Sequence, residues 1–230
     1  PQGRWDMRHV VRSPYNQYPV EPTAADVLTR LGVTMTYCKT LNPVDYDLIH
    51  ETGHAESIKN IVGTYGGRAE HPRRAWEYGI VLHALREAGC RRILDVGGGG
   101  SVFDPAAAWI GMEVTVVDPE DYGGWVAHQN RIVAAHNSSA PPIRYDRADF
   151  MTYEPDGQFD AVTCISVLEH VTHDGAFYNK LASHVKVGGV LALTVDFWPD
   201  GAAKSPDHLR TYNEDRLSAL AQSVPGFETF

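Results

Sequence analysis

The pattern of hydrophobic and polar positions changes near residue 75. Residues 1–75 show little regular periodicity, and prolines and aromatic residues are scattered through them. Two helices are predicted in this part, one over Ala24–Leu31 and one from Asp45 to about Ile61, each followed closely by a glycine. From Arg74 onward, short apolar runs and amphipathic stretches follow one another at regular intervals.

Strands alternating with helices are predicted for the second part of the chain. The predicted strands are Arg92–Val96, Glu113–Val117, Pro142–Tyr145, Phe159–Ile165 and Val190–Val195. The predicted helices are Ala75–Ala88, Pro105–Ile110, Trp125–Ala135, Ala176–Val185 and Asn213–Gln222. This alternation favours a Rossmann-like, doubly wound α/β fold with a mostly parallel sheet and helices on both faces. We therefore expect an irregular or helical N-terminal lid that binds substrate, residues 1–75, and an α/β domain, residues 76–230.

Composition and charge exclude several classes of protein. The 230 residues are 43% hydrophobic, which is enough for a core and excludes disorder throughout. No apolar stretch approaches the ~20 residues that span a bilayer, and no secretory signal opens the sequence, so we expect a soluble, cytoplasmic protein. The net charge of −9 disfavours a general nucleic-acid binder. Three distant cysteines, Cys38, Cys90 and Cys164, indicate neither a disulfide framework nor a paired-cysteine zinc site.

Four glycines follow the predicted strand Arg92–Val96 and lead into a helix. Residues without a Cβ let the backbone approach a ligand closely. Asp118 ends the next strand, where a carboxylate can accept hydrogen bonds from both ribose hydroxyls of an adenosine. Asp95 precedes the glycines, and its charge would repel a pyrophosphate but attract a cationic amino-acid group. The segment thus favours a cationic adenosine ligand over a nicotinamide or flavin dinucleotide; the structural alternative is a plain turn with Asp118 as a helix cap.

From Arg74 to Tyr212 the sequence resembles the class I, Rossmann-like S-adenosylmethionine-dependent methyltransferases. Asp95–Gly99 is similar to the first motif of that family, Phe159–Val171 to its fourth-strand motif beside the methyl group, and Val187–Leu191 to its turn into the fifth strand. The resemblance implies a methyltransferase with S-adenosylmethionine as its cofactor. The cofactor-binding residues that it implies are Asp95, Gly97, Gly98, Gly99, Asp118, Asp149, Phe150 and Ser166.

Residues around the start of the predicted domain are expected to complete the cofactor site. Arg68 can pair with the methionine carboxylate through a bidentate contact, and Trp76 can close over the cofactor. The alternative for Arg68 is a solvated arginine at the surface. The segment Arg74–Tyr78 resembles methyltransferases of small-molecule and saccharide pathways. Together with the acidic charge, this favours a hydroxyl or amine acceptor on a small or saccharide-like molecule, with a protein side chain as the alternative.

Candidate catalytic residues stand just past the fourth predicted strand. A sulfonium methyl group is already activated, so in-line positioning supplies much of the acceleration, and an oxygen or nitrogen acceptor can also need a general base. A histidine side chain has an unperturbed pKa of about 6.5 and can take a proton near neutrality, so His170 is a candidate for that base, as is Glu169. Asp196–Trp198 and His208–Tyr212 are expected to line the acceptor pocket. The alternative is that these residues have structural roles, as a helix cap, a hydrogen bond or core packing.

Two alternatives and one puzzle stay open at this point. The segment His50–His54 fits the zinc-hydrolase pattern H-E-x-x-H, although Gly53 weakens the helix that the pattern needs, and our assignment includes no metal ligand. A catalytically idle scaffold subunit is the second alternative. The puzzle is that such folds finish with an antiparallel strand pair, whereas only one short strand fits near Gly226–Phe230. We therefore expect either a fragment, or a partner subunit or second copy at the sheet edge.

Overall fold

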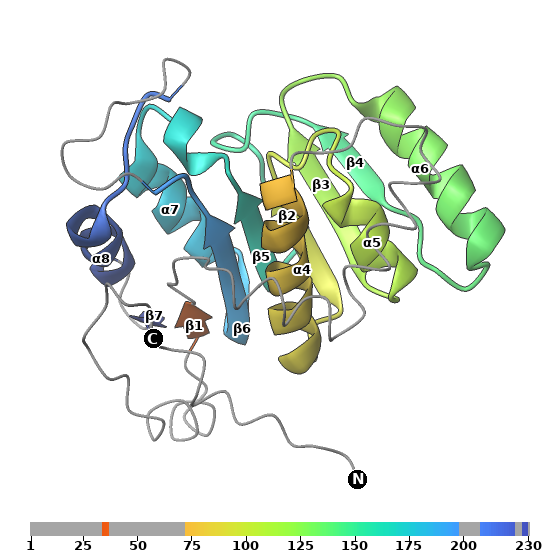
Figure 1. The fold of residues 1–230 in the computed structure, drawn as a ribbon, viewed down its shortest axis with the longest axis horizontal. Coiled ribbons are helices and arrows are strands. Elements are labelled where there is room, and N and C mark those ends of the chain that lie inside the picture. Colours follow the sequence, from red (N-terminus) through yellow and green to blue (C-terminus); the bar gives the residue numbers. More distant parts are fainter. Residues whose placement is uncertain (1–33, 37–71, 198–207, 224–226, 230) are drawn as a thin grey trace, which may run out of the picture.

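The computed structural model describes residues 34–36, 72–197, 208–223 and 227–229 (Figure 1). The strands among them are β1 (Thr34–Thr36), β2 (Arg92–Val96), β3 (Glu113–Asp118), β4 (Arg144–Arg147), β5 (Phe159–Ile165), β6 (Val185–Thr194) and β7 (Phe227–Thr229). The helices are α4 (Pro72–Glu87), α5 (Phe103–Trp109), α6 (Gly123–His136), α7 (Asp174–Ser183) and α8 (Glu214–Gln222), with a 3₁₀ turn, η2, at Leu168–His170.

The described strands form one sheet in the order β4-β3-β2-β5-β6-β1-β7, and every pairing between them is parallel. The chain moves from β2 outward to β3 and β4, and then returns to β5 on the other side of β2. The neighbours β2 and β5 therefore flank the point where the winding direction reverses. In open α/β sheets, ligands bind in the crevice outside the carboxyl ends of such strands.

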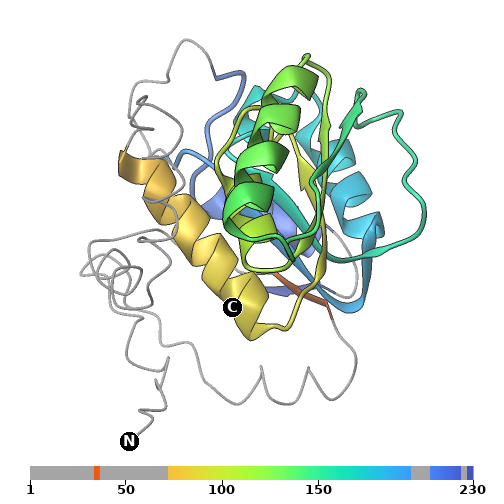
Figure 2. The ribbon, with the colours of Figure 1, turned by 90° about the vertical axis from the view of Figure 1, so that its right-hand side faces the viewer.

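Helices cover both faces of the sheet, which gives the domain two hydrophobic cores. Apolar residues of α4, α5 and α6 pack on one face, where Ile93 and Val116 are fully buried. Residues of α7 and α8 pack on the other face against Leu94 and Leu191. Figure 2 shows α4 and α7 on opposite sides of the sheet. Because the inner strands are buried on both faces, their sequences are continuous apolar runs, which is the pattern of a parallel sheet.

Local sequence signals set the limits of the helices beside the site. Helix α4 begins at Pro72, whose missing N–H and fixed φ suit the first helical turn. It ends before Gly89, which has a φ of +70°, and Cys90 N donates to Leu85 O at 2.9 Å. Asn213 caps α8, since its side chain accepts from Arg216 N at 2.9 Å.

The fold confirms the predicted Rossmann-like α/β class and differs from the predicted elements at several boundaries and at the edge of the sheet. Helix α7 ends at Ser183 and β6 begins at Val185, which pairs with Phe159, so the prediction that Val185 is helical was wrong. The one short strand expected near the end of the sequence does form as β7, and it pairs in parallel with β1 instead of forming the antiparallel pair that is usual in such folds. A strand from the expected lid, residues 1–75, thus contributes to the sheet.

Several sequence expectations lie outside the described residues, namely the helices predicted over residues 24–31 and 45–61 and the H-E-x-x-H segment, residues 50–54. Within the described part of the chain, no helix combines the length and the apolar character that crossing a membrane requires. The division into residues 1–75 and 76–230 and the expected partner at the sheet edge stay predictions.

Candidate functional site

A cavity of about 420 Å³ opens at the carboxyl ends of β2 and β5, where the winding of the sheet reverses. Its lining comes from the start of α4, the glycine-rich loop after β2, the loop after β3 and the end of β5. The lining residues are Arg74, Tyr78, Asp95, Gly97, Gly98, Gly100, Ser101, Tyr122, Ile165 and Ser166. The cavity therefore brings together residues that are far apart in the sequence, as the parallel topology predicts.

Asp95 is the buried acid of this cavity. Its side chain is 1% exposed, and its Oδ1 accepts a hydrogen bond from Thr163 Oγ1 on the neighbouring strand at 2.5 Å. Burial raises the pKa of Asp95 to about 6, although the hydrogen bond from Thr163 opposes this rise. Within the described residues no lysine or arginine pairs with Asp95, so a cationic group of a ligand fits beside it.

The backbone at the loop's third glycine passes between Asp118 and the ring of Tyr122. A Cβ on Gly99 would lie 3.1 Å from Asp118 Oδ2 and 3.0 Å from Tyr122 Cε2, and its φ of +50° also favours glycine. Asp118 is 7% exposed, its Oδ1 accepts from Glu120 N at 2.9 Å, and burial raises its pKa. The second oxygen of Asp118 thus lies against the glycine loop.

A chain of polar contacts joins α4 to the end of β5. Arg74 Nη1 pairs with Glu77 Oε2 at 2.9 Å, and Glu77 Oε1 accepts from Ser166 Oγ at 3.1 Å. Ser166 has a φ of +51°, and its backbone N–H donates to Thr194 O at 3.0 Å. Such strained backbone is typical of functional sites. These contacts connect Arg74 and Ser166, which line the same cavity.

A second group of polar residues surrounds η2. Glu169 is 1% exposed, burial raises its pKa, and its Oε2 has no hydrogen-bond partner within the described part of the chain. The rings of His170 and His208 lie 5.2 Å apart, and His208 Nε2 is 3.3 Å from Asp196 Oδ2. One ligand atom from each of Glu169, His170 and His208 lies within 4.8 Å of the other two, so this trio is the described group that could hold a metal ion.

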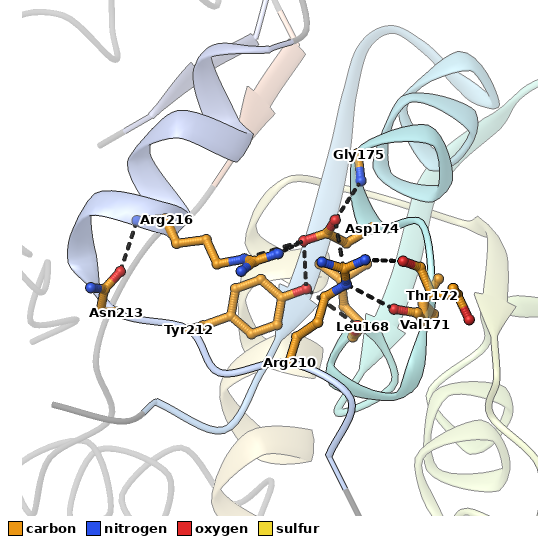
Figure 3. Close-up of polar contacts among 9 residues, drawn as sticks. All are labelled: Leu168, Val171, Thr172, Asp174, Gly175, Arg210, Tyr212, Asn213 and Arg216. Carbon is orange, nitrogen blue, oxygen red and sulfur yellow. Dashed lines mark hydrogen bonds and ion pairs between the residues drawn. The ribbon is translucent and has the colours of Figure 1, made fainter. Parts of the chain in front are cut away.

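The segment that carries His208 is held in place by hydrogen bonds and ion pairs to η2 and to the start of α7, several of which are drawn in Figure 3. Leu209 N donates to Glu169 O at 2.9 Å, and Arg210 Nε donates to Val171 O at 3.1 Å. Asp174, at the start of α7, accepts from Tyr212 OH at 3.2 Å and from Arg216 Nη2 at 2.9 Å (Figure 3). These contacts fix the segment after β6 against η2 and so set where His208 meets Glu169.

The structure places the sequence-predicted residues in three groups. Asp95, Gly97, Gly98 and Ser166 line the cavity, and Gly99 and Asp118 border it. Asp149 is exposed and caps its own turn through Met151 N at 2.8 Å, whereas the Phe150 ring packs in the core 5.0 Å from Phe177, so neither is among the lining residues. Arg68 and the side chain of Trp76 lie outside the described residues.

Of the residues predicted to line the acceptor pocket, some come together in the structure and one does not. Glu169, His170, Asp196 and His208 come together, but Tyr212 is fully buried and hydrogen-bonds to Leu168 O, so for this residue the core-packing alternative holds in place of the pocket wall. Sequence reasoning missed Tyr122 at the cavity and considered Arg74 only as part of a motif. Two features of the sequence could have identified these residues. Tyr122 is an aromatic residue four positions after Asp118, and Arg74 lies one helical turn before the apolar part of the predicted helix.

Comparisons with known proteins agree with this geometry. The family model described as a methyltransferase domain matches residues 94–191. The ubiquinone biosynthesis O-methyltransferase of Xanthomonas campestris is 36% identical over 105 residues, 45% of this chain and 42% of that protein. The mitochondrial ubiquinone biosynthesis O-methyltransferase of Schizosaccharomyces pombe is 30% identical over 137 residues, 56% of this chain and 47% of that protein. The chain thus spans less than half the length of these curated relatives.

Solved structures share the fold. TehB from Haemophilus influenzae aligns with a TM-score of 0.58 at 17% identity, over 72% of this chain and 55% of that one. The 1,6-didemethyltoxoflavin-N1-methyltransferase of Burkholderia thailandensis aligns with a TM-score of 0.52 at 16% identity, over 81% of this chain and 80% of that one. The order of motifs, the parallel sheet and the matching domain model agree: residues 94–191 are a methyltransferase domain of the class I, Rossmann-like S-adenosylmethionine-dependent type.

Proposed function

We propose that this protein binds S-adenosylmethionine in the cavity beside β2 and transfers its methyl group to a hydroxyl or amine of a small-molecule acceptor. The observation that carries the proposal is the buried carboxylate of Asp95 at a cavity that is also lined by bare glycine backbone. Such a site suits a ligand with a cationic group next to an adenosine. When bound, the cofactor supplies an activated methyl group, and the chain supplies binding, orientation and a base.

On the side of the site that would bind the methyl donor, each polar group has one proposed role. Asp95 would face the methionine ammonium, and Arg74 would face the methionine carboxylate, because both line the cavity. Glu77 holds the Arg74 guanidinium in place through an ion pair. Burial alone would lower the pKa of Arg74, but the charge and hydrogen bond of Glu77 keep that pKa above its usual value. Asp118 would accept the ribose hydroxyls. We keep Asp149 and the backbone N–H of Phe150 as the proposed adenine contacts.

The acceptor side is proposed to lie over η2. The exposed ring of His170 is in a position to take the proton of an acceptor hydroxyl or amine, and the buried Glu169 lies beside it. Phe197 and Leu209 expose 40% and 57% of their surface nearby, on the segments that contact Tyr212 and Glu169. Exposed apolar side chains next to a base favour an acceptor with an apolar or aromatic body.

The curated relatives support a hydroxyl acceptor, since their names describe O-methylation in ubiquinone biosynthesis. We therefore place phenolic and other small hydroxyl compounds first and saccharide-like amines second. We also propose that the protein works in the cytoplasm. The two described cysteines, Cys90 and Cys164, are free and buried, which agrees with a reducing compartment.

A methyl-transfer assay tests this function. The protein is incubated with S-adenosylmethionine that carries a labelled methyl group and with a panel of catechols, simple phenols, amino sugars and a peptide mixture. Label transfer to a small hydroxyl or amine compound, lost in an Asp95→Asn variant, is the expected result. Label transfer only to peptides would contradict the proposed acceptor class. Cofactor binding without transfer to any acceptor in the panel would favour the idle scaffold instead.

A further inference from the structure

Two buried acids, not one, lie beneath the glycine loop. Asp104, the second residue of α5, is 2% exposed, as buried as Asp95 at the end of β2. A Cβ on Gly98 would collide with Asp95 Oδ2 and lie 3.2 Å from Asp104 Oδ2, so both carboxyl groups reach the same point under the loop. Asp95 lines the cavity, whereas Asp104 stands behind it.

Asp95 and Asp104 are both buried and approach the same point under the loop, so a proton on one of them would let it donate to the other. Their remaining partners are weak donors. Thr163 Oγ1 donates to Asp95, Ser101 Oγ donates to Asp104 Oδ2 at 3.2 Å, and Asp104 Oδ1 has no partner within residues 72–197 and 208–223. Two adjacent carboxylates that are both buried and both charged would be very unfavourable without a cation.

The surroundings decide which acid keeps the proton. Several titratable or charged groups face the pair or line the same cavity. They are Asp118 from β3, Cys164 from β5, Tyr122 from the loop after β3, and Tyr78 and Arg74, with the Arg74 partner Glu77, from α4. Burial and the charge of Asp95 raise the pKa of Asp104 well above its ordinary value, while the hydrogen bond between them favours the ionised form of Asp95. Thr163 Oγ1 donates to Asp95 at 2.5 Å, whereas Asp104 has only the longer bond from Ser101 and an oxygen without a partner in the described part of the chain, so Asp104 is the poorer site for a negative charge. Asp104 is therefore the donor and Asp95 the acceptor.

We propose that Asp104 is a positioning residue of the donor site, which stays neutral and donates its proton to Asp95 so that one oriented negative charge faces a cationic ligand. This inference rests on the proposed binding of S-adenosylmethionine and adds a role for a residue outside the cavity wall. Its consequence is specific. Asp104 should contribute to the affinity only for ligands that have an ammonium group. An asparagine should be able to replace Asp104, because its side-chain amide also donates a hydrogen bond.

Two ligands and two variants test the proposal by calorimetric titration at pH 7.0. S-adenosylhomocysteine carries the amino-acid group, whereas 5′-methylthioadenosine contains the nucleoside without it. We expect Asp104→Asn to bind both ligands within about twofold of the wild type, because the amide preserves the hydrogen bond. We expect Asp104→Ala to bind S-adenosylhomocysteine about tenfold more weakly, with binding of 5′-methylthioadenosine changed less than about threefold.

A pH series adds a second readout. In the wild type, affinity for S-adenosylhomocysteine should fall as the pH drops through about 6, where Asp95 takes up a proton. Loss of the donor should move this fall to higher pH in Asp104→Ala but not in Asp104→Asn. Equal losses for both ligands in Asp104→Ala, or an Asp104→Asn variant as weak as Asp104→Ala, would overturn the proposal. If the wild type binds 5′-methylthioadenosine but not S-adenosylhomocysteine, or binds neither, the proposed function fails instead.

Discussion

Val167 fills the space that a side chain at residue 97 would need. A Cβ on Gly97 would lie 2.5 Å from Val167 Cγ2 and 2.8 Å from Val167 Cγ1, and the φ of +76° at Gly97 is itself unfavourable for other residues. The first residue of the glycine loop thus packs directly against the residue that follows Ser166. This contact connects the ends of β2 and β5 on the floor of the proposed cofactor site.

A double-mutant cycle should separate the two constraints on Gly97. Gly97→Ala should lower the free energy of unfolding by about 2–5 kcal/mol, the sum of left-handed backbone strain and overpacking. In a Val167→Ala background the same change should cost only about 1–2 kcal/mol, because the backbone strain alone remains. Urea unfolding of the four proteins measures this difference. Additive effects of the two substitutions would show that Val167 does not occupy this space in solution.

Asp118 should contribute to cofactor affinity through ribose hydrogen bonds. Asp118→Asn keeps an acceptor for Glu120 N–H but loses the charge, and it should weaken S-adenosylhomocysteine binding by about 1–3 kcal/mol. The matched control is Glu120→Gln, which alters an exposed acid two residues away and should leave affinity unchanged. Equal affinities of Asp118→Asn and the wild type in a calorimetric titration would refute the ribose assignment.

His170 should act on the acceptor and not on the donor. Once an acceptor is identified, His170→Ala should lower kcat by about 100-fold or more, the usual contribution of a general base. Affinity for S-adenosylhomocysteine should stay the same in this variant. His173→Ala, a change at another exposed histidine three residues further on, is the control. A normal kcat in His170→Ala would leave the histidine with a structural role only.

Asp174 should make the domain less stable at acidic pH than at neutral pH. Burial alone would raise its pKa, but the hydrogen bond and charge of Arg216 hold the pKa of Asp174 below its ordinary value (Figure 3). A carboxyl with a lowered pKa in the folded state stabilises the fold above its unfolded pKa of about 3.9, and this contribution is lost as the pH falls below that value. Asp174→Asn should therefore lower the melting temperature at pH 7 but reduce the further drop as the pH falls below about 4. An unchanged pH profile would contradict this role.

The central sheet could be predicted from the sequence because its signals are local. The runs Arg92–Val96 and Phe159–Ile165 are largely apolar and end in glycines or polar residues, and both coincide with the strands of the fold. The end of the first of these strands identified Asp95, whereas Ser166 was implied by the resemblance of Phe159–Val171 to the fourth-strand motif of the family. Parallel strands place their carboxyl ends at one edge of a sheet, so the amino-acid pattern alone predicts that these two residues meet.

The rest of the site depends on packing between distant segments. The parallel pairing of β1 with β6 and β7 joins segments about 150 to 190 residues apart, which no periodicity reveals. Arg74 and Tyr122 reach the cavity only because α4 and the loop after β3 pack where they do. Asp104 did leave a signal, a single acid among the apolar residues of Phe103–Trp109, but its partner Asp95 could be found only in three dimensions.

Calorimetric titration of the 230-residue chain with S-adenosylhomocysteine at pH 7.0 tests the central claim most directly. The arrangement of Asp95, the glycine loop, Asp118 and Arg74 predicts saturable binding of one ligand per chain with a dissociation constant below about 1 mM, equivalent to at least ~4 kcal/mol of binding free energy. Asp95→Asn should abolish or strongly weaken this binding while the protein stays folded. Absence of binding to the folded wild-type protein at millimolar ligand would contradict the account.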